Sequence, residues 1–210
     1  YLAPWALGSL GQFTWKNGQI IYRKSSPFGI NLRHPPPERL RLSGSDKTSM
    51  LAQTHLKQQL DALRHSTVSG FVRLRVAANV DLFPGWLAAQ TLYPRIYWQA
   101  RGPKSPEYVA LGAIHELTRP EDIQRVCDLA NTSSEDSPRY YGGLAFDPAQ
   151  PGWQGFGPCR FVLPRIELVR RGECISLCLN LWLPAQDKVH EFDAELQAAE
   201  AALDALQPEA

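Results

Sequence analysis

The chain has 210 residues, of which 44% are hydrophobic and 20% charged, and its formal net charge is +1. These proportions are typical of one soluble globular domain and exclude a collagen-like, coiled-coil or wholly disordered chain. No apolar run approaches the roughly 20 residues that a membrane-spanning helix needs, and the start lacks the pattern of a secretory signal. We therefore expect a cytoplasmic protein without a membrane partner.

The first 49 residues differ from the rest in charge and pattern. They hold seven basic and two acidic residues, whereas residues 50–210 hold fifteen basic and nineteen acidic ones. The run Pro35-Pro36-Pro37 and several glycines interrupt this arm, whose only strand-like stretch lies around Gln19 to Arg23. Because Met50 is the only methionine, we predict that translation begins there and that residues 1–49 are not a native domain.

A basic arm could instead bind nucleic acid or a membrane surface. The charges of residues 1–49 are scattered among prolines, however, and lack the interleaved aromatic side chains of a nucleic-acid-binding surface. We therefore expect no nucleic-acid partner.

Apolar spacing and end signals predict four helices from Met50 onward. The first carries Leu56, Leu60 and Leu63 on one face, with Ser49 as the N-cap and Gly70 just beyond its end. The others are a short helix that begins at Asp81 with Pro84 in its first turn, a helix over 119–129 capped by Thr118, and a terminal helix marked by Val189, Phe192, Leu196, Leu203 and Leu206.

Strands are predicted where β-branched and aromatic residues alternate with polar ones. The last strand is the clearest, since Leu177, Leu179 and Leu181 share a face that must lie on a core. The order of elements predicts an α+β fold with a mostly antiparallel sheet and flanking helices. The predicted strands are 71–76, 93–100, 108–117, 139–146, 159–170 and 173–183, with turns at Arg101–Lys104 and Arg171-Gly172.

Residue types and spacing point to no cysteine-based metal site. The cysteines stand at positions 127, 159, 174 and 178, which does not suit a disulfide framework, so we expect reduced, partly buried thiols. Cys174 and Cys178 share one side of a predicted strand, about 13 Å apart at roughly 3.3 Å per residue. That separation is too large for both to bind one zinc ion at about 2.3 Å per bond.

No catalytic constellation emerges either. His115, Asp147 and a cysteine could form a nucleophilic triad, but no sequence signature of an activated nucleophile accompanies them. The glycines at 152, 155 and 157 match neither a phosphate-binding loop nor a dinucleotide fingerprint, so Trp153 and Phe156 are expected to fold back onto the sheet. Glu167 is the one acid of interest, and a cross-strand or flanking ion pair is its simplest interpretation. We assign no catalytic, cofactor-binding or metal-binding residue.

Four stretches carry a resemblance to a known family. They are Gln90-Thr-Leu-Tyr-Pro-Arg-Ile-Tyr-Trp-Gln99, Val109-Ala-Leu-Gly-Ala-Ile114, Tyr141-Gly-Gly-Leu-Ala-Phe-Asp-Pro148 and Phe161-Val-Leu-Pro-Arg-Ile-Glu-Leu168. In this order and at this spacing they resemble the N-terminal part of chorismate-utilising enzymes, most closely the isochorismate synthases of the menaquinone pathway. The likeness covers about residues 50–206 and leaves out residues 1–49.

The resemblance implies the fold of the N-terminal half of those enzymes and a parent enzyme that converts chorismate to isochorismate with Mg²⁺. In the family a lysine is the general base on the attacking water, a glutamate protonates the leaving hydroxyl, and further glutamates hold the metal. Those residues belong to the C-terminal part, which we expect to be missing from this chain. Residues 50–210 would then be a scaffold that binds no metal and is inactive by itself.

The matched residues are expected to build the sheet of that scaffold. Gly142 and Gly143 should mark close approaches, Phe146 and Leu163 should lie in the core, and Pro164 should lie at an edge or bulge.

Two alternatives stay open. Anthranilate, aminodeoxychorismate and salicylate synthases share the broad pattern, so the parent could be one of these. The chain could also be a free-standing α+β binding module, which should be a soluble monomer, whereas a fragment should expose apolar surface.

Overall fold

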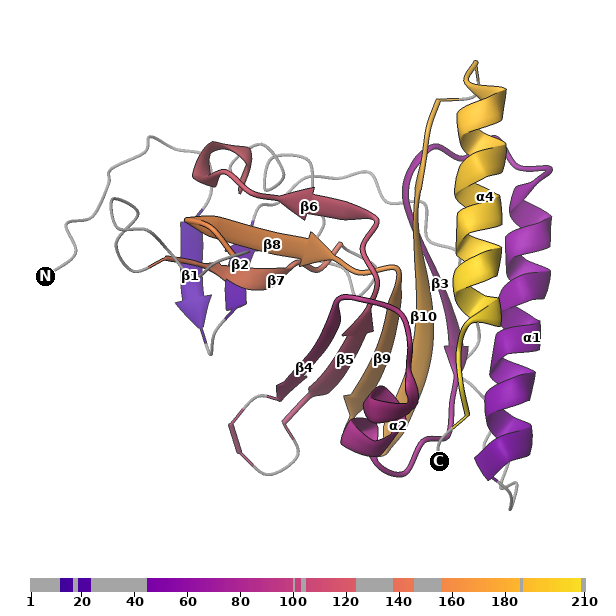
Figure 1. Cartoon of the computed structure of the whole chain (residues 1–210), viewed down its shortest axis with the longest axis horizontal. Helices are drawn as coiled ribbons and strands as arrows, with labels where there is room; N and C mark the ends of the chain where they lie inside the picture. Colours follow the sequence, from indigo (N-terminus) through magenta and orange to yellow (C-terminus); the bar gives the residue numbers. More distant parts are fainter. Residues whose placement is uncertain are drawn as a thin grey trace, which may run out of the picture.

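The computed structural model describes residues 12–16, 19–23, 45–99, 101–102, 105–123, 138–145, 156–185 and 187–208, with side chains from residue 51 onward. Two antiparallel sheets and three helices organise most of this part of the chain (Figure 1). A separate hairpin joins β1 (Gln12–Lys16) to β2 (Gln19–Arg23). The strand expected near Gln19 to Arg23 is therefore confirmed, whereas its partner β1 was not predicted.

The larger sheet has five strands in the order β3-β10-β9-β5-β4, and all neighbours are antiparallel. The strands are β3 (Gly70–Ala77), β10 (Cys174–Leu183), β9 (Ile166–Arg171), β5 (Glu107–Leu111) and β4 (Arg95–Gln99). β4 pairs with β5, the strands on either side of the predicted turn at Arg101–Lys104. β9 pairs with β10 across the predicted turn at Arg171-Gly172, in which Gly172 has φ +60°.

Helices α1 (Ser45–Leu63) and α4 (Val189–Asp204) lie side by side on one face of this sheet (Figure 1). The core between these helices and the sheet contains Leu56 and Leu60 of α1, Leu196 and Leu203 of α4, and the predicted leucine face of β10. Each fully buried leucine contributes about 1.5–3 kcal/mol, so this face supplies much of the stability. No described helix has the length and hydropathy of a membrane span.

A short helix, α2 (Phe83–Ala89), packs on the same side of the sheet through Phe83 and Trp86. The helix begins at Phe83, so the predicted start at Asp81 was two residues early, while Pro84 lies in the first turn as expected. Two further details differ from prediction. Ser49 lies inside α1, which begins at Ser45, and Val189 is 60% exposed because it opens α4 at the edge of the core.

The smaller sheet has three strands in the order β6-β8-β7. These are β6 (His115–Leu117), β8 (Cys159–Leu163) and β7 (Tyr141–Leu144). The strands predicted over 108–117 and 159–170 are each divided between the two sheets. Both were read as continuous because the apolar pattern does not stop at the corner.

The corner itself has a local cause. Gly112 has φ +65°, a conformation that favours glycine, and a Cβ at this position would lie 3.3 Å from Cβ of Arg165. Backbone hydrogen bonds from Ile114 N to Leu163 O (2.9 Å) and from Arg165 N to Leu111 O (3.0 Å) keep the two segments paired through the bend. Pro164 therefore lies at a corner between sheets and not at the predicted edge or bulge.

Several expectations concern residues outside the described part. The predicted helix over 119–129 is described only over 120–123, which is helical. Cys127, Phe146, Asp147 and Trp153 lie outside the described residues.

Candidate functional site

Glu167 lies on the face of the large sheet that is opposite the helices. The register pairs it with Cys178 of β10 on one side and with Ala110 of β5 on the other. Both neighbours are buried, and Glu167 itself is 0% exposed. Burying an isolated carboxylate is costly, so its partners decide whether the charged form is tolerated.

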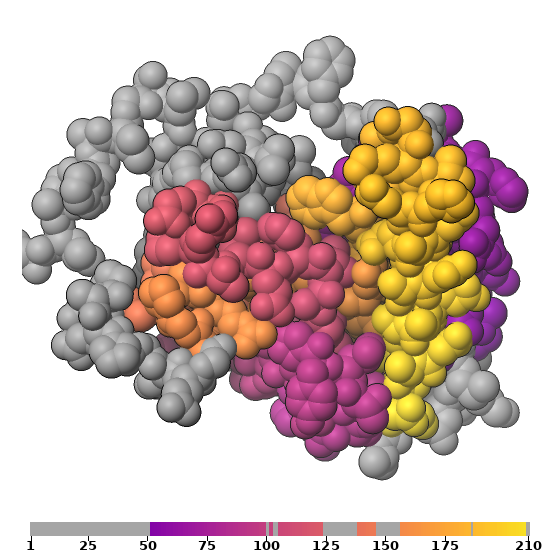
Figure 2. Space-filling view, turned by 45° about the horizontal axis from the view of Figure 1, so that its top comes forward, coloured from indigo at the N-terminus to yellow at the C-terminus, as the bar shows by residue number. Residues whose placement is uncertain are grey.

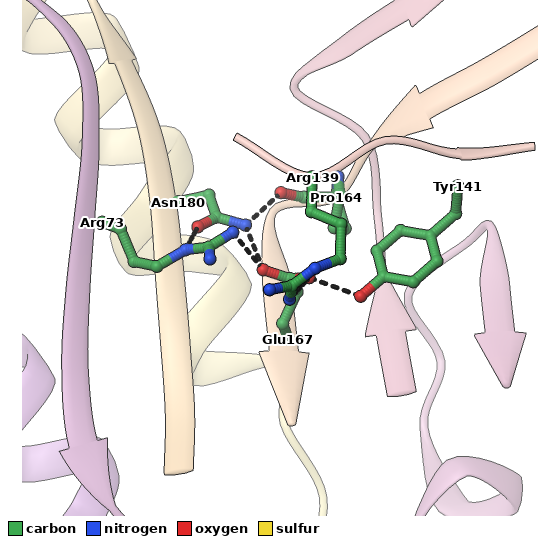
Figure 3. Close-up of polar contacts among 6 residues, drawn as sticks. All are labelled: Arg73, Arg139, Tyr141, Pro164, Glu167 and Asn180. Carbon is green, nitrogen blue, oxygen red and sulfur yellow. Dashed lines mark hydrogen bonds and ion pairs between the residues drawn. The ribbon is translucent and has the colours of Figure 1, made fainter. Parts of the chain in front are cut away.

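The two carboxylate oxygens accept bonds from four side chains (Figure 3). Oε1 accepts from the Tyr141 hydroxyl at 2.6 Å and from Nη1 of Arg139 at 3.1 Å. Oε2 forms an ion pair with Nη2 of Arg73 and accepts from Nδ2 of Asn180 at 3.3 Å. We call these five residues the Glu167 cluster. They come from β3, β7, β9, β10 and the segment before β7, so the cluster joins both sheets.

Asn180 orients the other members of the cluster. Its Oδ1 accepts from Nε of Arg73 at 2.8 Å, and its Nδ2 also donates to the carbonyl of Pro164 at 2.9 Å. Asn180 is 0% exposed. A single buried amide thus ties the guanidinium on β3 and the corner at Pro164 to the same carboxylate.

An aromatic layer covers the cluster. The guanidinium of Arg139 lies 4.5 Å from the ring centroid of Tyr108, and the Tyr141 ring meets Tyr108 edge-on at 6.4 Å. The ring of Trp98 also packs against Tyr108, with the ring centroids 5.4 Å apart. This apolar surrounding lowers the local dielectric, so each bond to Glu167 is stronger than it would be in water.

The cluster holds fixed protonation states. Burial raises the pKa of Glu167, but Arg73, Arg139 and the bonds from Tyr141 and Asn180 outweigh burial and lower it below its usual value. Burial and the neighbouring carboxylate raise the pKa of Tyr141 well above 10.0, and they raise the pKa of Cys178 to about 11. Because none of these groups titrates near neutral pH, the geometry suits positioning better than proton transfer.

A second ion pair fixes α4 to the same corner. Nη1 and Nη2 of Arg165 donate to the two oxygens of Glu195 at 2.7 and 2.9 Å. Nη1 also reaches the carbonyl of Asn180 at 3.1 Å, and Glu195 accepts from the backbone N of Trp182 at 2.8 Å. Bidentate geometry of this kind is specific as well as strong. These bonds therefore link the corner, β10 and α4 directly to one another.

The ion pair expected for Glu167 is confirmed, but its partners are not the flanking arginines. Arg170 bonds instead to Glu107 at 2.9 Å. Sequence reasoning missed Arg73, Arg139, Tyr141 and Asn180 as a group. The usable signals were an arginine on a half-buried strand and an asparagine inside the leucine-rich β10.

The described residues bring together no complete triad from the other sequence candidates. Nδ1 of His115 lies 2.8 Å from the hydroxyl of Tyr140, and the triad partner Asp147 is outside the described residues. The described cysteines are free thiols, with Cys159 and Cys178 buried and Cys174 exposed. Within the described ranges, no three or more His, Cys, Asp or Glu residues are grouped to hold a metal ion.

The close approaches predicted at Gly142 and Gly143 have different outcomes. A Cβ on Gly142 would lie 1.9 Å from the carbonyl oxygen of Arg160, so the expected close approach is confirmed there. At Gly143 the nearest described heavy atom would be Cζ of Phe156 at 3.8 Å, an ordinary contact, so the described residues show no close approach there. The same contact confirms that Phe156 folds back onto the sheet. Leu163 is fully buried, as predicted.

Comparisons with known proteins agree with this fold. The family model described as "Chorismate binding enzyme" matches residues 58–210. "Isochorismate synthase MenF" of Escherichia coli (strain K12) is 37% identical over 97 residues, which are 46% of this chain and 20% of that protein.

A solved structure, "Structure and Mechanism of MenF, the Menaquinone-Specific Isochorismate Synthase from Escherichia Coli", matches with a TM-score of 0.60 and 24% identity. The match covers 78% of this chain and 35% of that chain, so this chain spans only about a third of that relative. The structural likeness confirms the predicted α+β architecture of antiparallel sheets with flanking helices.

Proposed function

Because the chain belongs to the chorismate binding enzyme family, we propose that it supplies the N-terminal scaffold of an isochorismate synthase, which converts chorismate to isochorismate. The observation that carries this proposal is the family match over residues 58–210, together with the 37% identity to MenF over 97 residues. The stretches that resemble the family form β4, β5, β7, β8 and β9, the strands that meet around the corner and Glu167.

The geometry supports a structural contribution of these residues to catalysis. Glu167 is fully buried and bonded to four side chains, so it is not placed to receive a substrate. What it does is hold Arg139 and Tyr141, and through them β7, against the large sheet. In the proposal this bond set fixes the relative position of the two sheets on which the rest of the enzyme is built.

We assign the chemistry to the remainder of the enzyme. The resemblance implies Mg²⁺, a lysine base and glutamate ligands, and the described residues contain no cluster that fits a metal ion. When bound, the metal would hold the substrate carboxylate and stabilise developing charge. The proposal therefore gives this chain no metal ligand and expects no turnover from the 210 residues alone. The proposal also keeps the cytoplasmic location that the sequence predicts.

A chimera tests the function. Residues 51–208 of this chain would replace the matching part of Escherichia coli MenF, and formation of isochorismate from chorismate would be followed with and without Mg²⁺. We expect Mg²⁺-dependent product from the chimera and none from MenF with the matching part deleted. A chimera that folds, as shown by cooperative thermal unfolding, but forms no isochorismate would overturn the proposal.

Binding measurements on the 210-residue chain alone distinguish a scaffold from a free-standing binding module. A scaffold is expected to bind a dye that reports exposed apolar surface and not to bind chorismate. A monomer that excludes the dye and binds chorismate in calorimetry would favour the free-standing module.

A further inference from the structure

We propose that the surface around α2 is the docking surface for the C-terminal part of the enzyme. We define this α2 patch by its exposed apolar and aromatic residues: Leu82, Pro84, Ala88, Tyr93 and Tyr97. The inference rests on the proposed function, which makes this chain one part of a longer enzyme.

The patch contains three exposed large hydrophobic side chains. Leu82 is 67% exposed, Tyr93 69% and Tyr97 41%, and these are three of the large hydrophobic side chains exposed in the described part of the chain. The register pairs Tyr97 with the buried Val109, so Tyr97 lies on the helix side of the sheet beside α2. Tyrosine is enriched at protein interfaces because it buries a large area with few rotatable bonds.

A chain of hydrogen bonds holds the patch together on the side of Tyr97. Its hydroxyl donates to Oε1 of Glu107 at 2.9 Å, and Oε2 of Glu107 accepts from Arg170 at 2.9 Å. Arg170 then donates to the backbone carbonyl of Asp81 at 2.8 Å, directly before Leu82. The Tyr97 hydroxyl is thus linked through Glu107 and Arg170 to the backbone directly before Leu82.

On the side of Tyr93, Arg95 holds the patch together through hydrogen bonds. Its Nη1 donates to the carbonyl of Gln90 at 2.9 Å, and its Nη2 donates to the Tyr93 hydroxyl at 2.7 Å. The guanidinium also lies 4.5 Å from the centroid of the Tyr93 ring. A surface ordered in this way loses little conformational entropy when it is covered, which favours binding.

The contacts among the described residues leave Tyr93 69% and Tyr97 41% exposed. Both belong to the stretch Gln90–Gln99 that carries part of the resemblance to the family. From the same stretch, Ile96 and Trp98 pack against the sheet around Tyr108. Neither tyrosine belongs to a core cluster of the described residues, so we look to the C-terminal part of the enzyme for a contact.

The position of residue 207 indicates the occupant. Gln207 N donates to Oε1 of Gln90 at 3.0 Å, and Nε2 of Gln90 donates to the carbonyl of Gln207 at 3.0 Å. This pair holds the last described residues against the end of α2, at the border of the patch. In Figure 2 the magenta segment that contains α2 lies at the surface next to the end of α4. In a longer enzyme, residues that follow would begin beside the patch.

The chimera described above provides the test, because it contains both parts. Hydroxyl-radical footprinting would compare the modification of Tyr93 and Tyr97 in the 210-residue chain and in the chimera. We expect both tyrosines to be modified at least threefold less in the chimera. Val189 serves as the control, since it is 60% exposed at the opposite end of α4 and should not change.

A pair of matched variants gives a second readout. Leu82→Asp should lower the thermal midpoint and the activity of the chimera, whereas Val189→Asp should leave both unchanged. An active chimera in which Tyr93 and Tyr97 stay fully modified, or in which Leu82→Asp has no effect, would overturn the docking proposal and leave the proposed function standing. An inactive but folded chimera would overturn the proposed function itself, and the docking proposal with it.

Discussion

The two faces of the five-stranded sheet are built on different principles. The face under α1 and α4 is a continuous layer of aliphatic side chains, to which β10 contributes Leu177, Leu179, Leu181 and Leu183. The opposite face buries the Glu167 cluster of charged and amide groups beneath aromatic rings. Apolar burial is tolerant of shape, whereas a buried charge is tolerated only with its full set of partners. The first face therefore gives stability, and the second specifies how the sheets meet.

Removing the charge of Glu167 should have the largest effect. Glu167→Gln leaves the guanidinium groups of Arg73 and Arg139 buried without their counter-charge, which we expect to cost about 3–5 kcal/mol of unfolding free energy. Urea unfolding of the 210-residue chain measures this loss. The control is Glu173→Gln at the exposed β9–β10 turn, which should change stability by less than about 0.5 kcal/mol. A loss below about 1 kcal/mol at Glu167 would contradict the distinction between the two faces.

Truncating a side chain of the aliphatic face should lower the free energy of unfolding somewhat less. The loss should depend only on the volume of the side chain. Leu179 is 0% exposed, so Leu179→Ala is expected to lose about 2–5 kcal/mol through lost burial and a residual cavity. Leu179→Met keeps the volume and should lose less than about 1.5 kcal/mol. Equal losses for the two variants, measured by urea unfolding, would show that this face is as demanding as the opposite one.

The difference between the faces also explains what could be predicted from the sequence. The leucine period of β10 and the spacing of Leu56 and Leu60 predicted the helix-covered core, because a repeat is a local property. The corner was missed because apolar residues run through Gly112 and Pro164 without interruption. Only the positive φ of Gly112 and its contact with Arg165 reveal the bend.

The Glu167 cluster was missed for a related reason. Glu167 stood out as an acid on an apolar strand, but its partners Arg73 and Arg139 lie 94 and 28 residues away along the chain. Their meeting depends on strand order and on the corner, neither of which has a local signature. A residue whose burial is unexpected can be identified from a sequence, but its counter-charges require the topology.

The joint between the sheets can be tested at Gly142. A Cβ there would lie 1.9 Å from the carbonyl oxygen of Arg160, so Gly142→Ala must push β7 away from β8. We expect a loss of about 1–3 kcal/mol from this overpacking. Gly143→Ala is the matched control, since its nearest contact would be 3.8 Å, and it should lose distinctly less. If the two variants melt at the same temperature, the spacing of β7 and β8 does not limit stability.

The pH dependence should locate the carboxylate directly. The folded-state pKa of Glu167 is lowered, so the unfolded chain binds more protons below the unfolded value of about 4.3. Its contribution to stability is present above that pH and is lost as the pH falls through the lower, folded value. The stability difference between the unmodified chain and Glu167→Gln should therefore shrink on acidification. A difference that is constant from pH 7 to pH 3 would assign the loss to packing instead of charge.

The smallest effect is expected where the same chemistry lies at the surface. Lys57 of α1 and Asp204 of α4 form an ion pair whose side chains are 40% and 58% exposed. Water and salt screen such a pair, so Lys57→Ala should cost only about 0.2–1 kcal/mol, and 1 M NaCl should abolish most of it. The Glu167 cluster is out of reach of that screening, and its loss in Glu167→Gln should persist in salt. Urea unfolding of both variants at low and high salt would decide whether burial, and not the mere presence of charge, separates the two faces.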